Sequence, residues 1–196
     1  MSTPMVCEAC HTLQPVGTAE PFELLNLPVT YQIDLTELEN VYLRLSRMVH
    51  PDYFGTTGGP EKRLSEDLSA RLNNAYRLLK DPLARSDFLL TRSGGPAASH
   101  DKRVPPDLLG EVLDLREKIE QAKSAGRTAE LAEVHAQLTR RSGAAFEQLA
   151  RLHAELESAQ EAGHAAAPKV GELLSRIRMA INGIHFLQNL VKESRA

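Results

Sequence analysis

The residues best suited to chemistry are a histidine and an aspartate two positions apart, His50 and Asp52, with Pro51 between them. An imidazole and a carboxylate so close together can act as a general acid and base. No nucleophile motif and no phosphate-cradling glycine motif accompanies them, which argues against catalysis. A structural role is simpler, because Pro51 stops a helix and Asp52 can hydrogen-bond the backbone of a turn. The tripeptide alone favours this structural role.

Cys7 and Cys10 form a second candidate site. The two-residue gap lets two thiolates share one metal ion, but structural zinc normally takes four ligands. His11 is poorly placed to join them, and the sequence has no second Cys-x-x-Cys. Half a ligand set cannot close a site, so we predict no metal ligands and no cofactor.

The composition is typical of a soluble helical protein. Of 196 residues, 42% are hydrophobic and 25% are charged, but only 5% are aromatic, and this shortage of β-formers favours helices. The net charge of −3 gives no overall attraction for nucleic acid or an anionic membrane. No apolar run approaches the ~18 residues of a membrane span, and the first residues lack the basic and apolar regions of a signal peptide. We therefore expect a cytoplasmic protein without nucleic-acid or membrane partners.

Two long helices must position His50 and Asp52. Asp34 followed by Glu37 is a capping-box pattern that predicts the start of the first helix, and Pro51 ends it. Its apolar face is formed by Leu35, Leu38, Tyr42, Leu45 and Val49. Glycines and prolines predict a loop over 53–60, after which Leu64, Leu68, Leu72, Ala75 and Leu79 form one face of a second helix. A helical turn at 21–27 precedes this pair, and a short helix starting at Pro82 follows it.

The rest of the chain predicts three further helices after a small, polar linker. Their apolar stripes are Leu108, Val112, Leu115, Ile119 and Ala122; Leu131, Val134, Leu138, Ala145, Leu149, Leu152 and Leu156; and Val170, Leu173, Ile177, Ile181, Ile184, Leu187 and Val191. Gly126 and residues 163–168 separate them, and three antiparallel helices can bury such stripes together. We predict an all-α protein with a flexible tail at 1–20, a first domain at 21–95, a linker at 96–104 and a three-helix bundle at 105–196.

The order of elements around His50-Pro51-Asp52 resembles the J-domain. The resemblance becomes specific in Pro-Phe-Glu-Leu-Leu at 21–25 and in Asn-Ala-Tyr-Arg-Leu-Leu-Lys-Asp-Pro-Leu-Ala-Arg-Ser-Asp-Phe-Leu-Leu at 74–90. Both segments are similar to the HscB family, the J-type co-chaperones of iron–sulfur cluster assembly. The similarity is strong over residues 21–95 and looser over the bundle. It implies a J-domain joined to a three-helix client-binding bundle, with no enzymatic activity and no catalytic residues.

The resemblance also implies two partners. The His-Pro-Asp loop would engage a DnaK-class ATPase chaperone of the HscA type and promote its ATP hydrolysis, and the bundle would carry the IscU-type scaffold. Arg44 and Arg47 lie near the end of the helix that leads into the loop, where they suit the helix dipole and could also steer an acidic partner. The expected chaperone-binding residues are His50, Pro51, Asp52, Arg44 and Arg47.

The first bundle helix has more apolar surface than one seam requires, because Leu109 and Leu113 lie beside its inward stripe. They fit either a broad core-facing stripe or a small exposed interface. The HscB resemblance implies a client-binding role for Leu-Asp-Leu-Arg-Glu at 113–117, and for an aromatic on the last helix whose best counterpart is Met179. Gly110 departs from the family, which usually has a bulky apolar residue there, so this face is thinner or the alignment shifts. The expected client-binding residues are Leu109, Leu113, Arg116, Glu117 and Met179.

Some HscB relatives carry an N-terminal tetracysteine zinc module, and residues 7–14 resemble its second half alone. The cysteine pair is then a remnant in a mobile tail, a metal site completed by another chain, or a redox pair. The remaining histidines are expected on linker or helix surfaces: His100, His135, His153, His164 and His185. Two alternative functions stay open, a general J-domain protein for unfolded clients and a metal-binding or redox helical protein acting through Cys7 and Cys10.

Overall fold

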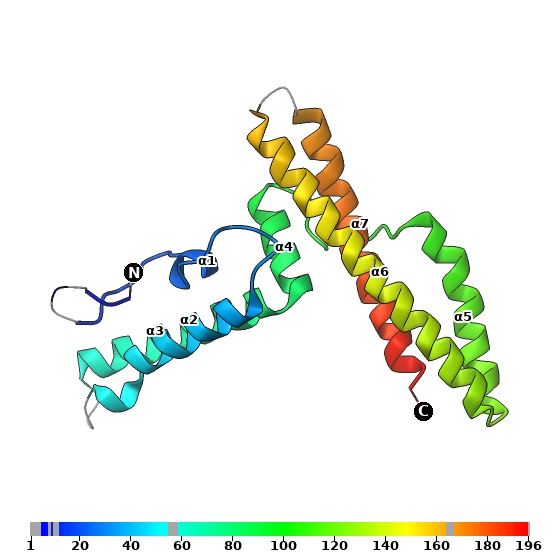
Figure 1. Ribbon diagram of the computed structural model, residues 1–196, viewed down its shortest axis with the longest axis horizontal. Coiled ribbons are helices and arrows are strands. Elements are labelled where there is room, and N and C mark those ends of the chain that lie inside the picture. The colour runs from blue at the N-terminus through cyan, green and yellow to red at the C-terminus, as the bar shows by residue number, and fades with distance from the viewer. Residues whose placement is uncertain (1–4, 8, 10–11, 55–58, 164–166, 196) are drawn as a thin grey trace. The chain divides into compact units, whose positions relative to one another are not determined.

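The predicted all-α fold is confirmed. A computed structural model describes residues 5–7, 9, 12–54, 59–163 and 167–195, and within them it contains helices but no strand (Figure 1). The helices are α1 (Pro21–Leu24), α2 (Leu35–Met48), the 3-10 turn η1 (Pro51–Tyr53), α3 (Pro60–Lys80), α4 (Pro82–Arg92), α5 (Pro106–Ser124), α6 (Thr128–Glu161) and α7 (Ala167–Glu193). None of the described helices is both long and apolar enough to cross a bilayer.

The chain forms two compact units, Met1–Arg85 and Ser86–Ala196. This division falls inside α4 and precedes the linker predicted at 96–104. The physical reason is that the second half of α4 contacts the bundle helices. The Ser86 hydroxyl lies 2.7 Å from Nε2 of His153, and buried Arg178 pairs with Asp87 and donates to the carbonyl oxygen of Pro96 at 2.8 Å.

In the first unit, α2 and α3 lie side by side (Figure 1). Their apolar faces are turned inward, since Leu38 and Leu45 of α2 and Leu68 and Leu72 of α3 are buried. The Asp34 carboxylate caps α2 by accepting from the backbone N–H groups of Thr36 and Glu37 at 2.8 and 3.3 Å. The buried side chains of this unit include Phe22, Leu24, Leu38, Leu45, Leu68, Leu72, Ala75 and Leu79. Leu35, which the periodicity placed on the inward face, is half-exposed because it lies in the first turn, at the edge of the contact with α3.

The second unit buries the predicted stripes of α5, α6 and α7 against one another. Its core includes Leu108, Val112, Leu115, Ile119, Ala122, Leu131, Val134, Leu138, Leu187 and Leu190. Gly126 ends α5 as predicted: its φ is +66°, and the next backbone N–H, of Arg127, donates to the carbonyl oxygen of Ala122 at 2.8 Å. A Cβ at Gly183 of α7 would lie 2.9 Å from Cδ of Pro105, so this glycine permits the close approach of the segment that begins α5.

Two of the histidines expected on surfaces are placed differently. His153 is buried, because it occupies an inward position of α6 next to Leu152 and four residues beyond Leu149, and there it contacts Ser86. His135 is half-buried, with Nδ1 2.9 Å from the Ser194 hydroxyl. His100 and His185 are exposed as expected, while His164 lies outside the described residues.

Candidate functional site

The His-Pro-Asp segment forms the short turn η1 directly after α2. His50 precedes this turn, and its Nδ1 accepts a hydrogen bond from the backbone N–H of Asp52 at 3.3 Å. The same nitrogen lies 3.6 Å from the Asp52 carboxylate. A ring nitrogen that accepts a hydrogen bond carries no proton, so in the neutral imidazole the proton is on Nε2. The turn therefore leaves one donor nitrogen and one carboxylate available to a partner.

These side chains are accessible from solvent. The exposed fraction is 50% for the His50 side chain and 86% for the Asp52 side chain. Arg47, Ser46 and Tyr53 line a shallow depression together with them. Arg44 is also exposed and lies on the preceding turn of α2. The structure therefore places both arginines on the exposed surface of the helix that leads into the loop.

Sequence reasoning missed Tyr53, which is among the most exposed large side chains of the described chain. Its ring points edge-on toward the His50 imidazole, with 6.1 Å between the ring centroids. An aromatic side chain immediately after a His-Pro-Asp turn, in a stretch otherwise predicted as loop, was the available signal. A surface aromatic next to a polar cluster is well suited to contact another protein.

Two hydroxyl groups of α3 anchor the residue that leads into the His-Pro-Asp turn. The carbonyl oxygen of Val49, the residue before His50, accepts hydrogen bonds from Ser65 at 2.6 Å and from Ser69 at 3.0 Å. Ser65 and Val49 are both fully buried. Because α2 ends at this carbonyl, the two serines fix the direction in which the chain enters the turn. Sequence reasoning did not identify either serine.

The chemistry of this arrangement is that of recognition by exposed polar groups. An imidazole donor, a carboxylate acceptor and two guanidinium groups lie on one end of a packed hairpin, which orders them at little entropic cost on binding. In the part of the chain that the structure describes, no group of three or more His, Cys, Asp and Glu side chains could hold a metal ion.

On α5, Leu109 and Leu113 are 55% and 70% exposed. The alternative that they belong to a broad core-facing stripe is therefore wrong. Arg116 forms an ion pair with Glu193 of α7 at 3.3 Å and lies 5.8 Å from the centre of the Phe186 ring, so it ties α5 to α7. The Glu117 carboxylate accepts from Gln121 on its own helix at 3.0 Å.

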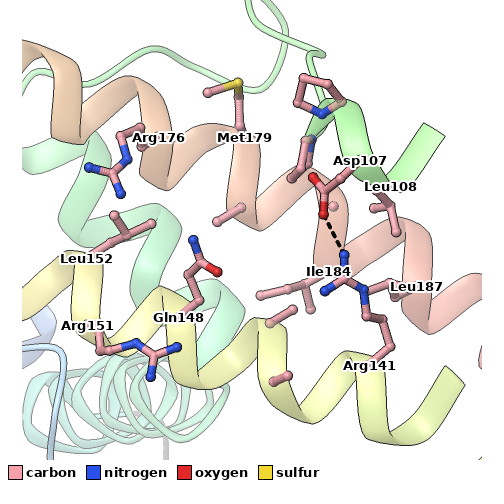
Figure 2. Close-up of a pocket in the computed structure, with 16 residues that line it drawn as sticks. Asp107, Leu108, Arg141, Gln148, Arg151, Leu152, Arg176, Met179, Ile184 and Leu187 are labelled. Atoms are coloured by element: carbon pink, nitrogen blue, oxygen red, sulfur yellow. Dashed lines mark hydrogen bonds and ion pairs between the residues drawn. The ribbon is translucent and has the colours of Figure 1, made fainter. Parts of the chain in front are cut away.

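Met179 lies on α7, partly buried, at a pocket that Leu109 and Leu113 do not line. Figure 2 shows it above this pocket, which is bounded by the first turn of α5 and by α6 and α7. Four of the five expected client-binding residues thus share α5, whereas the fifth is separated from them. Gly110 faces open space, so the helix offers no side chain between the two leucines on that turn.

The segment before α5 is anchored to α7 by a polar cluster. Arg103 donates to the Asp101 carboxylate from its side chain at 2.9 and 2.6 Å and from its backbone at 3.0 Å, and these bonds lower the pKa of Asp101 to about 2. The amide of Asn182 donates to the carbonyl oxygens of Asp101 and Arg103 at 2.9 and 2.8 Å. This cluster sets where α5 begins.

Of the two cysteines, only Cys7 lies within the described residues. Cys7 is a half-buried free thiol, whereas Cys10 and His11 lie outside the described residues. The backbone N–H of Cys7 donates to the carbonyl oxygen of Thr12 at 2.9 Å, beside an isolated bridge between Val6 and Leu13. Met5 and Val6 are buried, so part of the predicted tail contributes apolar side chains to the protein interior.

Comparisons with known proteins point to one family. A family model described as the HSCB C-terminal oligomerisation domain matches residues 104–178. The chain is 34% identical over 131 residues to a co-chaperone protein HscB homolog of Aromatoleum aromaticum, covering 66% of this chain and 74% of that protein. It is 34% identical over 160 residues to the homolog of Burkholderia multivorans, covering 81% and 89%. It is 32% identical to the iron-sulfur cluster co-chaperone protein HscB of Mus musculus, covering 64% and 54%.

Solved structures agree on the architecture. The human co-chaperone protein HscB superposes with a TM-score of 0.76 at 23% identity, covering 99% of this chain and 90% of that one. The chaperone HscB from Vibrio cholerae superposes with a TM-score of 0.70 at 25% identity, covering 90% and 95%. The human structure supports the fold alone at this identity, and the curated relatives supply the family relationship.

Proposed function

Since the chain belongs to the HscB family of co-chaperones, we propose that it brings an IscU-type iron–sulfur scaffold to a DnaK-class chaperone of the HscA type and stimulates ATP hydrolysis there. The observation that carries the chaperone step is the exposure of His50 and Asp52 at the end of the α2–α3 hairpin. Another protein could not contact a buried loop, but it can contact an exposed loop at the end of two packed helices.

The chaperone step is one of recognition. The Nε2–H group of His50 donates a hydrogen bond to the chaperone, and the Asp52 carboxylate accepts a hydrogen bond from a donor group of the chaperone. Arg44 and Arg47 attract an acidic surface of the chaperone and raise the rate of encounter. Because Ser65 and Ser69 already hold the loop, little conformational freedom is lost on binding.

The scaffold step uses the exposed apolar side chains of α5. Leu109 and Leu113 bury their surface against the scaffold, and Glu117 supplies a charged rim. Arg116, held between Glu193 and Phe186, keeps α5 in place under these leucines. The two partners use residues on different units, so a single chain raises the effective concentration of one partner near the other.

A steady-state ATPase assay tests the proposal. The full chain is added to the DnaK-class chaperone of the same organism, with and without the purified scaffold. We expect the chain to raise hydrolysis and the scaffold to raise it further. Equal enhancement by a permanently unfolded protein would instead indicate a general J-domain protein. Absence of any stimulation would contradict the proposal.

A further inference from the structure

The pocket beside Met179 combines an apolar floor with unbalanced positive charge. It has a volume of about 320 Å³ and is lined by residues of α5, α6 and α7, all in the second unit. Its apolar side chains include Leu108, Leu152, Met179, Ile184 and Leu187. This volume is at the lower end of ligand pockets, roughly 300–1,000 Å³, so it can receive a few side chains but not a whole helix.

Three arginines border the pocket, and they are not equivalent. Arg141 is already paired, at 2.6 Å from Asp107 and 3.3 Å from Glu111. Arg176 is only 4.0 Å from the Glu172 carboxylate. Among the described residues, no carboxylate lies within 4.0 Å of the Arg151 guanidinium. Within the described chain, Arg151 therefore forms no close ion pair, although Glu147 and Glu155 flank it one turn away on α6, and Arg176 forms one only at the 4.0 Å limit.

The unbalanced charge lies at one end of the pocket. Figure 2 shows Arg151 on α6 and Arg176 on α7 at this end, with Leu152 between them, and the Arg141–Asp107 pair at the other end. An occupant must therefore place a negative group at the Arg151 end and an apolar group on the floor. A peptide segment with an aliphatic side chain next to an Asp or Glu has this chemistry.

We propose that the pocket receives an acidic segment of the scaffold client, with an aliphatic side chain on the floor and a carboxylate paired with Arg151 and Arg176. This inference rests on the proposed function. It adds a second client-binding site on this chain, which receives an acidic part of the client. A protein occupant is supported because the start of α5 contributes to both surfaces: Leu108 lines the pocket, and Leu109, on another face of the helix, belongs to the proposed client surface. Charge complementarity supports an acidic one.

Titration of the scaffold into the full-length chain tests this inference. The test variant is Arg151→Glu with Arg176→Glu. The matched control is Arg140→Glu with Lys118→Glu, which makes the same change in charge at exposed positions of α6 and α5 outside the pocket. We expect the test variant to raise the Kd for the scaffold by about fivefold or more, and the control variant to leave it within about twofold.

A second measurement uses a neutral variant, which removes the two positive charges without adding negative ones. Raising the salt concentration should weaken scaffold binding by the wild-type chain more than binding by Arg151→Gln with Arg176→Gln, because the neutral variant has lost the charges that salt screens. Equal salt dependence of the two chains would overturn the inference.

The remaining outcomes separate this inference from the function on which it rests. If the affinity for the scaffold depends on Leu109 and Leu113 but not on Arg151 and Arg176, the pocket inference is overturned and the proposed function stands. If the wild-type chain does not bind the scaffold, both are overturned. If dodecanoate binds in an arginine-dependent way while scaffold binding is unaffected, the pocket takes a small amphiphile and the inference is overturned.

Discussion

The buried hydroxyl of Ser65 donates a hydrogen bond to the carbonyl oxygen of Val49, 2.6 Å away, and so links the second turn of α3 to the residue before His50. Ser69 donates to the same oxygen at 3.0 Å. A carbonyl at the end of a helix has no partner within that helix, so these bonds satisfy it without water. In this way α3 supports the end of α2 directly before the exposed turn.

Replacing Ser65 with alanine should weaken both the hairpin and its activity. We expect Ser65→Ala to reduce the free energy of unfolding by about 1 kcal/mol, since Ser69 still satisfies part of the Val49 carbonyl. ATPase stimulation should fall at the same time, because the turn loses one of its anchors. Urea unfolding and the ATPase assay measure the two effects. Ser158→Ala, at an exposed position of α6, is the control, and a Ser65→Ala chain identical to it in both assays would contradict this account.

The exposed leucines of α5 should matter for binding but not for stability. Leu109→Ala and Leu113→Ala should each change the free energy of unfolding by less than about 0.5 kcal/mol, because neither side chain is in the core. Each should raise the Kd for the scaffold, by about tenfold for a central contact. Leu115→Ala is the matched control, and its loss of buried side-chain volume should cost about 2–5 kcal/mol of stability. Unaltered scaffold affinity in both surface variants would remove these leucines from the interface.

Two glycines should respond oppositely to alanine. At Gly183 the new Cβ would lie 2.9 Å from the ring of Pro105, so Gly183→Ala should displace the start of α5 and cost about 1–3 kcal/mol. At Gly143 of α6 the Cβ would meet no atom within 4 Å, so Gly143→Ala should stabilise by up to about 1 kcal/mol through helix propensity. Thermal unfolding of both variants measures the difference, and a shift of the same sign in both would refute the close approach at Gly183.

Asp101 should make the second unit sensitive to acid. Its pKa is lowered from 3.8 to about 2 by the hydrogen bonds from Arg103, so the folded state holds the charged form more strongly than the unfolded state does. The stabilisation is therefore complete above the ordinary pKa and is lost as the pH falls toward 2. The stability difference between the wild type and Asp101→Asn should narrow between about pH 5 and about pH 3. Asp67→Asn, at an exposed position, is the control. A difference that does not change with pH would show that this carboxylate is not held by Arg103.

The sequence predicted the features that depend on neighbouring residues. Asp34 and Gly126 mark a helix start and a helix end through local hydrogen bonds and backbone angles, and both predictions are confirmed. The inward stripes of α5 followed in the same way from spacing alone.

Features that depend on distant residues could not be predicted. Ser65 and His153 are buried because their partners, Val49 and Ser86, approach from other segments. A polar residue at such a position looks like a surface residue in the sequence. The position of Arg151 at the pocket, without a close ion pair among the described residues, likewise became visible only in the structure.

The most direct measurement of the central claim is the ATPase activity of the DnaK-class chaperone in the presence of His50→Ala, at saturating scaffold. The account predicts that this variant still binds the scaffold with the wild-type Kd but loses almost all stimulation. His100→Ala, which removes another exposed imidazole, should stimulate as the wild type does. Full stimulation by a folded His50→Ala chain would contradict the role assigned to the exposed turn.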